Sequence, residues 1–302
     1  MQFLSAGTID AINKGTVKVI GRRKDDSVIA VYHGQKKILP KTQWDKETHD
    51  ATHYGTKMLK TILGGRFNYP KSLYAVADCL RYFVDENKDA IILDFFAGSG
   101  TTMHAVNFLN SDDDGNRRCI LVTNNEVSLE EANRLTQQGF KKGDDAWEEL
   151  GIAKYVTWPR TVCSIEGCDI YGKELKGEYI TTTDRKLKMS DGFNTNVKFF
   201  ACDWTPRKPE NYLLSNALCL HIREMIELQN AIEIDNVKNV LILNKTDFKN
   251  TIMNPDIYAQ IEKIWINQNI VLNSEELGML DEKGFKYIPR EFFGQELREA
   301  AE

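Results

Sequence analysis

The sequence predicts an α/β protein in which parallel strands alternate with helices. Three observations support this prediction. The apolar run Ile91–Leu93 predicts a buried strand, and it precedes a glycine turn and a helical stretch, Thr101–Asn110. A second continuous apolar run, Cys119–Val122, is typical of a buried parallel strand. Strand and helix patterns alternate again near the C-terminus, so we expect a second parallel unit there.

Composition places the chain among ordinary soluble globular proteins. Its 302 residues are 42% hydrophobic and 27% charged, which suits one large or two smaller domains. No apolar stretch approaches the roughly eighteen residues of a membrane helix, and the N-terminus lacks the pattern of a signal peptide. Six scattered cysteines suit reduced thiols, so we expect a cytoplasmic protein. Cys163 and Cys168 have neither a second pair nor a nearby histidine, so we expect no metal site.

Charge is unevenly distributed along the chain. The net charge of −5 argues against a nucleic-acid protein, but residues 1–71 carry +7 and the remainder −12. A basic segment on an acidic body is typical of local contact with a polyanion, and a solvated basic surface is an equally good interpretation. The candidates for such contact lie in two basic turns, at Arg22, Arg23 and Lys24 and at Lys36 and Lys37.

The first ninety residues contain a β-rich piece followed by helices. The runs Thr16–Ile20 and Ser27–Tyr32 alternate or are β-branched, which predicts a hairpin. Apolar residues between Met58 and Leu63 predict a short helix that ends at Gly64-Gly65. A longer helix is predicted from Ser72, which can cap it, to Val84.

The stretch Ile91–Thr102, IILDFFAGSGTT, is the main functional candidate. A strand, a glycine turn and a helix N-terminus form a cradle that lets the backbone approach a cofactor. A nicotinamide fingerprint would need a third glycine where Met103 stands, and a phosphate loop would need Gly-Lys-Ser/Thr. An ordinary strand–helix turn without a cofactor remains the alternative.

The later elements follow the same alternation. After an acidic-to-basic loop, Ser111–Arg118, the second strand leads to helices at Ser128–Gln138 and Asp145–Leu150 and a link at Gly151–Lys154. The low periodicity of residues 155–195 predicts a long irregular segment that contains a hairpin. Beyond it we expect, in order, a strand Asn196–Cys202, a helix from Asn211 to Ile232, a strand Asn239–Leu243, a helix Asp256–Lys263, a strand Trp265–Leu272, a helix Glu275–Leu280, a short run Phe285–Ile288 and a helical tail.

The string DFFAGSGTT resembles motif I of the class I S-adenosylmethionine (AdoMet) methyltransferases, and most closely the β-class amino-methyltransferases of DNA. Tyr69-Pro70-Lys71-Ser72-Leu73, which precedes it, resembles their motif X. The resemblance implies a partial Rossmann-like sheet with a C-terminal α/β extension. It also implies an AdoMet site formed by Asp94, Phe95, Phe96, Ala97, Gly98, Ser99, Gly100, Thr101 and Thr102, with Pro70, Lys71 and Ser72 at the methionine end.

An acidic residue after the second strand completes the expected site. In class I enzymes a strand-end carboxylate accepts hydrogen bonds from the two ribose hydroxyls, and Glu126 is our candidate. It lies 32 residues beyond Asp94, more than the usual spacing, and the Ser111–Arg118 loop accounts for most of the excess. A solvated glutamate is the alternative. Asp203 is a possible third strand-end acid near the adenine or the target base.

Several short sequence motifs occur in the same order as in the Mod subunit of type III restriction–modification systems, an adenine-N6 DNA methyltransferase, and the chain therefore resembles that family. They are Trp44-Asp45, Asp50-Ala51-Thr52, Gly55-Thr56, Leu59-Lys60, Phe67, the two motifs above and Val122-Thr123-Asn124-Asn125-Glu126. The resemblance implies duplex DNA as substrate, a Mod dimer or an upstream Mod fragment, and a helicase–endonuclease (Res) partner. We expect a recognition tail over residues 1–55, an AdoMet-binding part over 56–205 and a docking or dimerisation domain over 206–302.

The tetrad Asp/Asn-Pro-Pro-Tyr/Phe (motif IV) is absent from the sequence. Its polar atoms hold the target amine and its aromatic ring stacks on the flipped base. The nearest string, Asn254-Pro255-Asp256-Ile257-Tyr258, reads better as a helix start. We therefore assign no catalytic residue and expect this chain to need a catalytic segment from upstream. A non-catalytic module that binds AdoMet, DNA or another Mod chain is the alternative, and a methyltransferase with another substrate is a more distant one.

Overall fold

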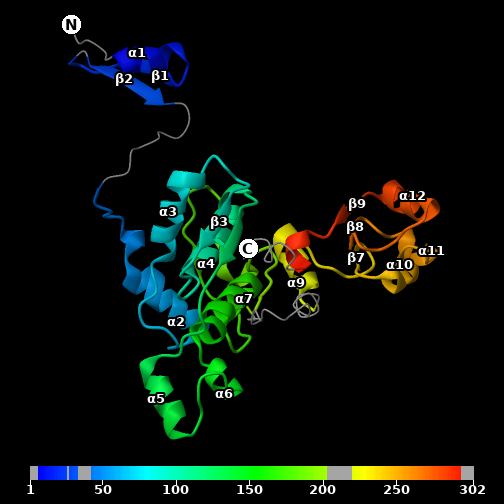
Figure 1. Cartoon of the computed structure of the whole chain (residues 1–302). Helices are drawn as coiled ribbons and strands as arrows, with labels where there is room; N and C mark the ends of the chain where they lie inside the picture. Colours follow the sequence, from blue (N-terminus) through cyan, green and yellow to red (C-terminus); the bar gives the residue numbers. More distant parts are fainter. Residues whose placement is uncertain (1–5, 26, 33–41, 203–219, 294–302) are drawn as a thin grey trace, which may run out of the picture. The chain divides into compact units, whose positions relative to one another are not determined.

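The computed structural model describes residues 6–25, 27–32, 42–202 and 220–293 (Figure 1). The chain divides into two compact units, Met1–Val197 and Lys198–Glu302. Among the described residues, no helix combines the length and apolar character that crossing a membrane requires.

The N-terminal piece of the first unit is a helix followed by a hairpin. Helix α1 spans Ala6–Asn13, and strands β1 (Val17–Arg22) and β2 (Val28–Tyr32) pair antiparallel, with an irregularity between Val19 and Gly21. The predicted hairpin is confirmed. Helix α1 was not predicted, because its residues, AGTIDAIN, carry only a weak apolar stripe.

Helices form the core of the first unit. They are η1 (Glu47–His49), η2 (Thr52–Lys57), α2 (Met58–Leu63), α3 (Leu73–Val84), α4 (Thr101–Asp113), η3 (Ala153–Thr157) and α7 (Trp158–Glu166). Side chains such as Leu59, Leu73 and Phe108 are at most 1% exposed and pack into one cluster. The predicted caps are confirmed: Ser72 Oγ accepts a hydrogen bond from the Ala75 N–H, and α2 ends at Gly64 with φ of +69°.

The strand pair that carries the candidate loop is parallel, as predicted. Strand β3 (Ile91–Asp94) pairs with β4 (Arg118–Leu121), with Ile91 opposite Arg118. One face of the pair packs through Ile92 against the α4 side chain Val106. The other face leaves Ile91 57%, Leu93 54% and Ile120 41% exposed. The prediction that both strands are buried is therefore wrong, because the described residues cover only one face.

Several predicted boundaries in the first unit are corrected. The loop expected from Ser111 begins later, because α4 continues to Asp113 and Asp114 closes it at φ of 56°. Where a link at Gly151–Lys154 and the start of an irregular segment were expected, the chain instead forms η3 and α7. Residues 196–202 contain no regular structure, so the strand expected there is wrong. The predicted hairpin is present but short. The remaining elements are α5 (Leu129–Gln137), α6 (Asp145–Glu148), β5 (Glu178–Tyr179), β6 (Leu187–Lys188) and η4 (Met189–Asp191).

The second unit is built on a three-stranded parallel sheet in the order β7-β8-β9, which confirms the predicted parallel arrangement. Its elements are α9 (Ile222–Asn230), β7 (Asn239–Ile242), α10 (Lys245–Thr251), α11 (Pro255–Tyr258), β8 (Lys263–Ile266), α12 (Ser274–Lys283), β9 (Phe285–Tyr287) and η5 (Arg290–Phe293). Helix α10 was missed, the helix expected at 256–263 is shorter, and the strand expected from Trp265 begins at Lys263. The first part of the helix expected from Asn211 lies outside the described residues.

Candidate functional site

The carboxylate of Asp94 closes the turn between β3 and α4. One oxygen accepts a hydrogen bond from the Phe96 backbone N–H at 3.0 Å, and the other accepts one from Thr102 Oγ1 at 2.6 Å. The Ala97 N–H donates to the Val122 carbonyl, so the turn is also tied to the chain that leaves β4. The acidic residue at the end of the strand therefore organises the turn locally.

Two glycines in this turn adopt left-handed backbone conformations. Gly98 has φ of +52° and Gly100 has φ of +76°, values that glycine tolerates without the cost of a Cβ. A Cβ on Gly98 would meet only the Phe96 carbonyl oxygen, at 3.8 Å. A Cβ on Gly100 would lie 3.2 Å from Thr157 Cγ2. The turn thus presents open space at Gly98 and a packed contact at Gly100.

Thr157 on η3 and Arg160 on α7 support the turn through hydrogen bonds. Thr157 Oγ1 donates to the Gly98 carbonyl at 2.6 Å. The Arg160 guanidinium donates through Nη1 to Ser99 Oγ at 2.9 Å and to Thr101 Oγ1 at 2.7 Å. Sequence reasoning missed both roles. Nothing in the spacing of Trp158-Pro159-Arg160 relates these residues to a turn some sixty residues earlier.

A buried aromatic and histidine cluster lies next to this support. His104, on α4, is fully buried, and its Nε2 is 2.9 Å from the Tyr179 hydroxyl. Burial, and to a lesser degree the charge of Arg160, lowers the pKa of His104 well below its usual value. Burial raises the pKa of Tyr179 above its usual range. Both groups are therefore neutral at neutral pH.

The segment after β4 is hydrogen-bonded to residues at the start of η3, the element that also holds the glycine turn. Glu126 is exposed, and its carbonyl accepts a hydrogen bond from the Ile152 N–H at 2.9 Å. Thr157 Oγ1 lies 3.1 Å from the Ile152 carbonyl as well as contacting Gly98. Asn125 Oδ1 accepts a bond from the Lys154 N–H. Glu126 and the glycine turn are thus joined through η3, as expected for groups at the carboxyl ends of neighbouring parallel strands.

The residues Pro70, Lys71 and Ser72 contact a different segment. Ser72 Oγ donates to the Thr48 carbonyl at 2.7 Å. A Cβ on Gly55 would lie 2.6 Å from the Pro70 carbonyl oxygen, so this glycine allows η2 to approach closely. None of the hydrogen bonds of the described residues joins Pro70–Ser72 to the glycine turn.

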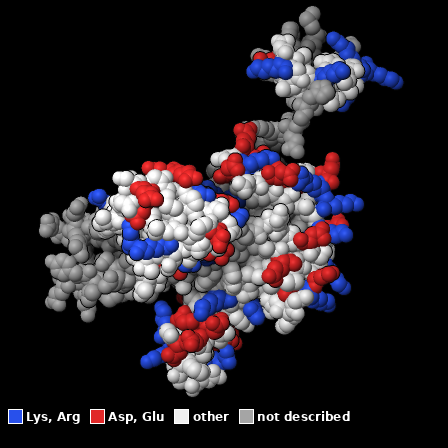
Figure 2. Space-filling model, turned by 90° about the vertical axis from the view of Figure 1, so that its right-hand side faces the viewer, with Lys and Arg blue, Asp and Glu red and all other residues white. Residues whose placement is uncertain are grey.

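Basic side chains lie on the N-terminal hairpin. Arg22, Arg23 and Lys24 are exposed, and Figure 2 shows Lys and Arg on the surface of this piece. Lys36, Lys37 and Asp203 lie outside the described residues. Among the described residues, no group of three His, Cys, Asp or Glu side chains could hold a metal ion.

The Asn254–Tyr258 string is a helix start, as predicted. Asn254 Oδ1 accepts a hydrogen bond from the Asp256 N–H, and Pro255 occupies the first turn of α11. Its tyrosine hydroxyl donates to the Met279 carbonyl on α12, so it packs within the second unit.

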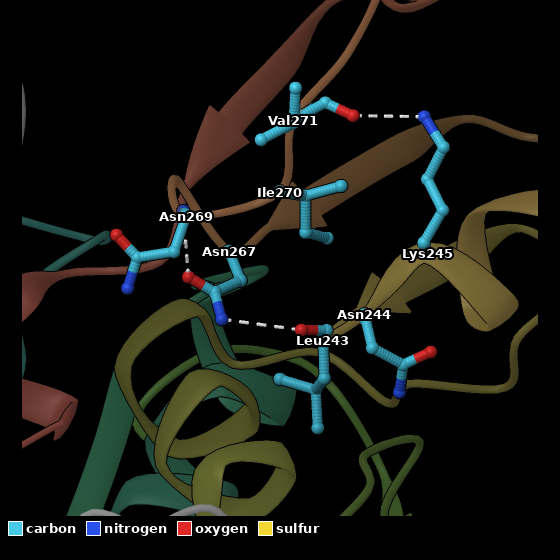
Figure 3. Close-up of a pocket in the computed structure, with 7 residues that line it drawn as sticks. All are labelled: Leu243, Asn244, Lys245, Asn267, Asn269, Ile270 and Val271. Atoms are coloured by element: carbon cyan, nitrogen blue, oxygen red, sulfur yellow. Dashed lines mark hydrogen bonds between the residues drawn. The ribbon is translucent and has the colours of Figure 1, made fainter.

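A hollow of about 400 Å³ lies at the carboxyl ends of β7 and β8 (Figure 3). Three of its polar side chains are Asn244, Lys245 and Asn267. Asn267 Nδ2 donates to the Leu243 carbonyl, and Lys245 Nζ donates to the Val271 carbonyl and pairs with Glu276 at 2.6 Å. Because these groups are already engaged within the unit, the hollow provides no set of converging free ligands.

Comparison with known proteins finds relatives that act in restriction and modification. The chain is 40% identical over 89 residues to the type III restriction-modification enzyme EcoPI Mod subunit of Escherichia phage P1, which covers 29% of this chain and 13% of that protein. It is 38% identical over 192 residues to the StyLTI Mod subunit of Salmonella typhimurium, covering 57% of this chain and 29% of that protein. It is 36% identical over 111 residues to the type II methyltransferase M.KpnI of Klebsiella pneumoniae, covering 36% and 26%.

These relatives confirm the predicted resemblance to Mod subunits, and the chain spans less than a third of the length of each. The model of the DNA methylase family (N6_N4_Mtase) matches residues 12–183, which include the hairpin, the glycine turn and the η3–α7 support. With more than half of its residues inside that match, the chain belongs to the DNA methylase family, whose reaction takes its methyl group from AdoMet.

Proposed function

We propose that this chain supplies the AdoMet-binding part of an adenine-N6 DNA methyltransferase of a type III restriction–modification system. The observation that supports this best is the turn between β3 and α4. Asp94 closes it, and Gly98 leaves an opening that a Cβ would fill. A ligand approaching there meets backbone and a helix N-terminus, as an adenosyl cofactor with an amino-acid tail requires.

We assign the residues of the site as follows. The turn Asp94–Thr102 surrounds the donor, and the exposed carboxylate of Glu126 accepts hydrogen bonds from the ribose hydroxyls. Pro70, Lys71 and Ser72 lie at the methionine end, and Asp203 lies near the adenine or target base. When bound, AdoMet supplies a methyl group on a sulfonium, which an amine nitrogen attacks.

We further propose that other residues of a longer protein present the target adenine. The sequence holds no Asp-Pro-Pro-Tyr tetrad, and the chain spans less than a third of its relatives. The uncovered face of β3 and β4, with Ile91 and Leu93 about half exposed, is a surface on which further elements of a Rossmann-like sheet pack in this proposal. The basic turn Arg22–Lys24 contacts DNA phosphates. A Mod partner chain and a Res subunit complete the proposed system.

Methyl transfer tests this function. The purified chain is mixed with tritiated AdoMet and unmethylated genomic DNA, alone and together with a separately expressed upstream fragment that contains Asp-Pro-Pro-Tyr. We expect incorporation into adenine only in the mixture. Incorporation by this chain alone would contradict the proposed division of labour, and transfer to protein or RNA would contradict the substrate.

A non-catalytic module that binds AdoMet, DNA or another Mod chain is the second candidate. It is supported by the absence of the tetrad from a sequence that keeps an intact glycine turn. The same experiment separates the two, because a module of this kind binds AdoMet but gives no incorporation with any upstream fragment.

A further inference from the structure

Arg160 is a buried cation whose described partners are all neutral. Its side chain is 0% exposed. Its Nη1 donates to the Ser99 carbonyl at 3.3 Å, to Ser99 Oγ and to Thr101 Oγ1, and its Nε has no hydrogen-bond partner among the described residues. Burying a guanidinium away from water costs several kcal/mol, on the order of the penalty for any ion, unless an anion compensates it.

No such anion is present among the described residues. The ion pairs formed there do not include Arg160, and its buried titratable neighbours, His104 and Tyr179, are neutral. Burial lowers the pKa of Arg160 to about 10, which still leaves it charged at neutral pH. The other buried arginine of this unit, Arg117, is instead paired with Asp113 at 2.8 Å. Arg160 therefore differs from Arg117, whose charge is compensated by a carboxylate.

A second source of positive potential lies at the same place. Ser99 and Thr101, which hold the guanidinium, stand at the N-terminus of α4, a helix of 13 residues. The aligned peptide dipoles make that end partly positive. The helix terminus and the buried cation therefore both favour an anion at the opening beside Gly98.

We propose that Arg160 is a positioning residue that makes the Gly98–Thr101 turn select ligands carrying a carboxylate. Within the proposed function, on which this inference rests, that group is the α-carboxylate of the methionine end of AdoMet. Arg160 does two things: it orients the hydroxyl groups of Ser99 and Thr101, which supports binding of any adenosyl ligand, and its charge produces most of the preference for a carboxylate. A purely structural brace would hold the turn equally well for any adenosyl ligand, whatever its charge.

Two ligands separate these roles. Decarboxylated AdoMet, S-adenosyl-3-methylthiopropylamine, lacks only the carboxylate. By titration calorimetry with the full chain we expect AdoMet to bind about tenfold or more tightly than the decarboxylated compound, the range for a charge-assisted interaction. In Arg160→Gln, which keeps a donor for Ser99 and Thr101 but removes the charge, that ratio falls severalfold, because only the N-terminus of α4 still favours the carboxylate. In Ser99→Ala, which keeps the charge, both affinities fall and the ratio remains.

Three results would overturn the inference: equal binding of both ligands by the wild-type chain, an unchanged ratio in Arg160→Gln, or a ratio lost in Ser99→Ala. If Arg160→Gln lacks a cooperative unfolding transition, Arg160→Lys replaces it. Lysine keeps the charge, so the preference for AdoMet should persist, and its loss would contradict the proposal. Failure of the wild-type chain to bind either compound would instead refute the proposed function.

Discussion

Replacing each of the two glycines of the turn, Gly98 and Gly100, with alanine should change different properties of the chain, namely its affinity for AdoMet and its stability. In Gly100→Ala the left-handed backbone at φ of +76° costs about 1–2 kcal/mol, and the new Cβ lies 3.2 Å from Thr157 Cγ2, a close contact that adds about 1–2 kcal/mol. In Gly98→Ala only the backbone cost of about 1–2 kcal/mol applies, because the nearest atom is 3.8 Å away. Gly100→Ala should therefore be the less stable variant.

Ligand binding should show the opposite order. The Cβ of Gly98→Ala occupies the open space in which we place AdoMet, whereas that of Gly100→Ala points at Thr157. Urea unfolding measures the free energy of unfolding of each variant, and titration calorimetry measures its affinity for AdoMet at a temperature where both are folded. We expect Gly98→Ala to lose more affinity and Gly100→Ala to lose more stability.

Thr157→Ser provides the matched control. Serine keeps the hydroxyl that donates to the Gly98 carbonyl and removes the Cγ2 methyl group that the Gly100→Ala methyl would meet. The double variant Gly100→Ala/Thr157→Ser should therefore recover the contact part of the loss. If the two alanine variants lose stability and affinity equally, or if Thr157→Ser recovers nothing, the distinction between an open and a packed side of the turn is wrong.

Three further predictions concern the remaining groups. Asp94→Asn can keep the Phe96 N–H bond, but it replaces the charge-assisted bond from Thr102 with a weaker one in which the new amide donates to Thr102 Oγ1. Unfolding experiments should show it to be about 1 kcal/mol less stable, and this loss should not add in full to that of Thr102→Val in the double variant. Burial lowers the pKa of His104, so below about pH 6.5 the unfolded chain binds a proton that the folded chain does not. The free energy of unfolding should therefore fall by up to about 1.4 kcal/mol per pH unit as the pH drops further. His104→Gln should flatten this slope, and an unchanged slope in that variant would contradict the prediction. Replacing Arg22, Arg23 and Lys24 with alanine should weaken DNA binding at low salt and leave AdoMet affinity unchanged. In a filter-binding or anisotropy titration, the slope of log affinity against log salt should fall in magnitude by roughly 2–3. An unaltered slope would exclude the hairpin as a phosphate contact.

Local signals predicted local structure well. The apolar run before Asp94 and the glycines after it predicted β3, the turn and α4, because backbone conformation there is dictated by nearby residues. Ser72 and Ser128 predicted their helix starts for the same reason, and both side chains accept the expected cap bonds. The parallel pairing of β3 with β4 followed from a strand–helix–strand order that has few alternatives.

Contacts between distant segments could not be predicted in this way. Thr157 and Arg160 reach the turn from about sixty residues away, and their own sequence, a Trp-Pro-Arg string, gave no sign of a helix. Leu93 was predicted to be buried because an apolar run is typical of a strand covered on both faces. Whether a second face is covered depends on other parts of the molecule, and here it is 54% exposed.

The central claim is that the Asp94–Thr102 turn binds AdoMet, and titration calorimetry of AdoMet into the full chain tests it most directly. The account predicts saturable binding with one site per chain, which Gly98→Arg abolishes because its side chain fills the opening beside the turn. The matched control Gly172→Arg, at another left-handed glycine with open surroundings, should bind like the wild type. Absence of binding by the wild-type chain, or binding by Gly98→Arg as tight as that of the wild type, would contradict the account.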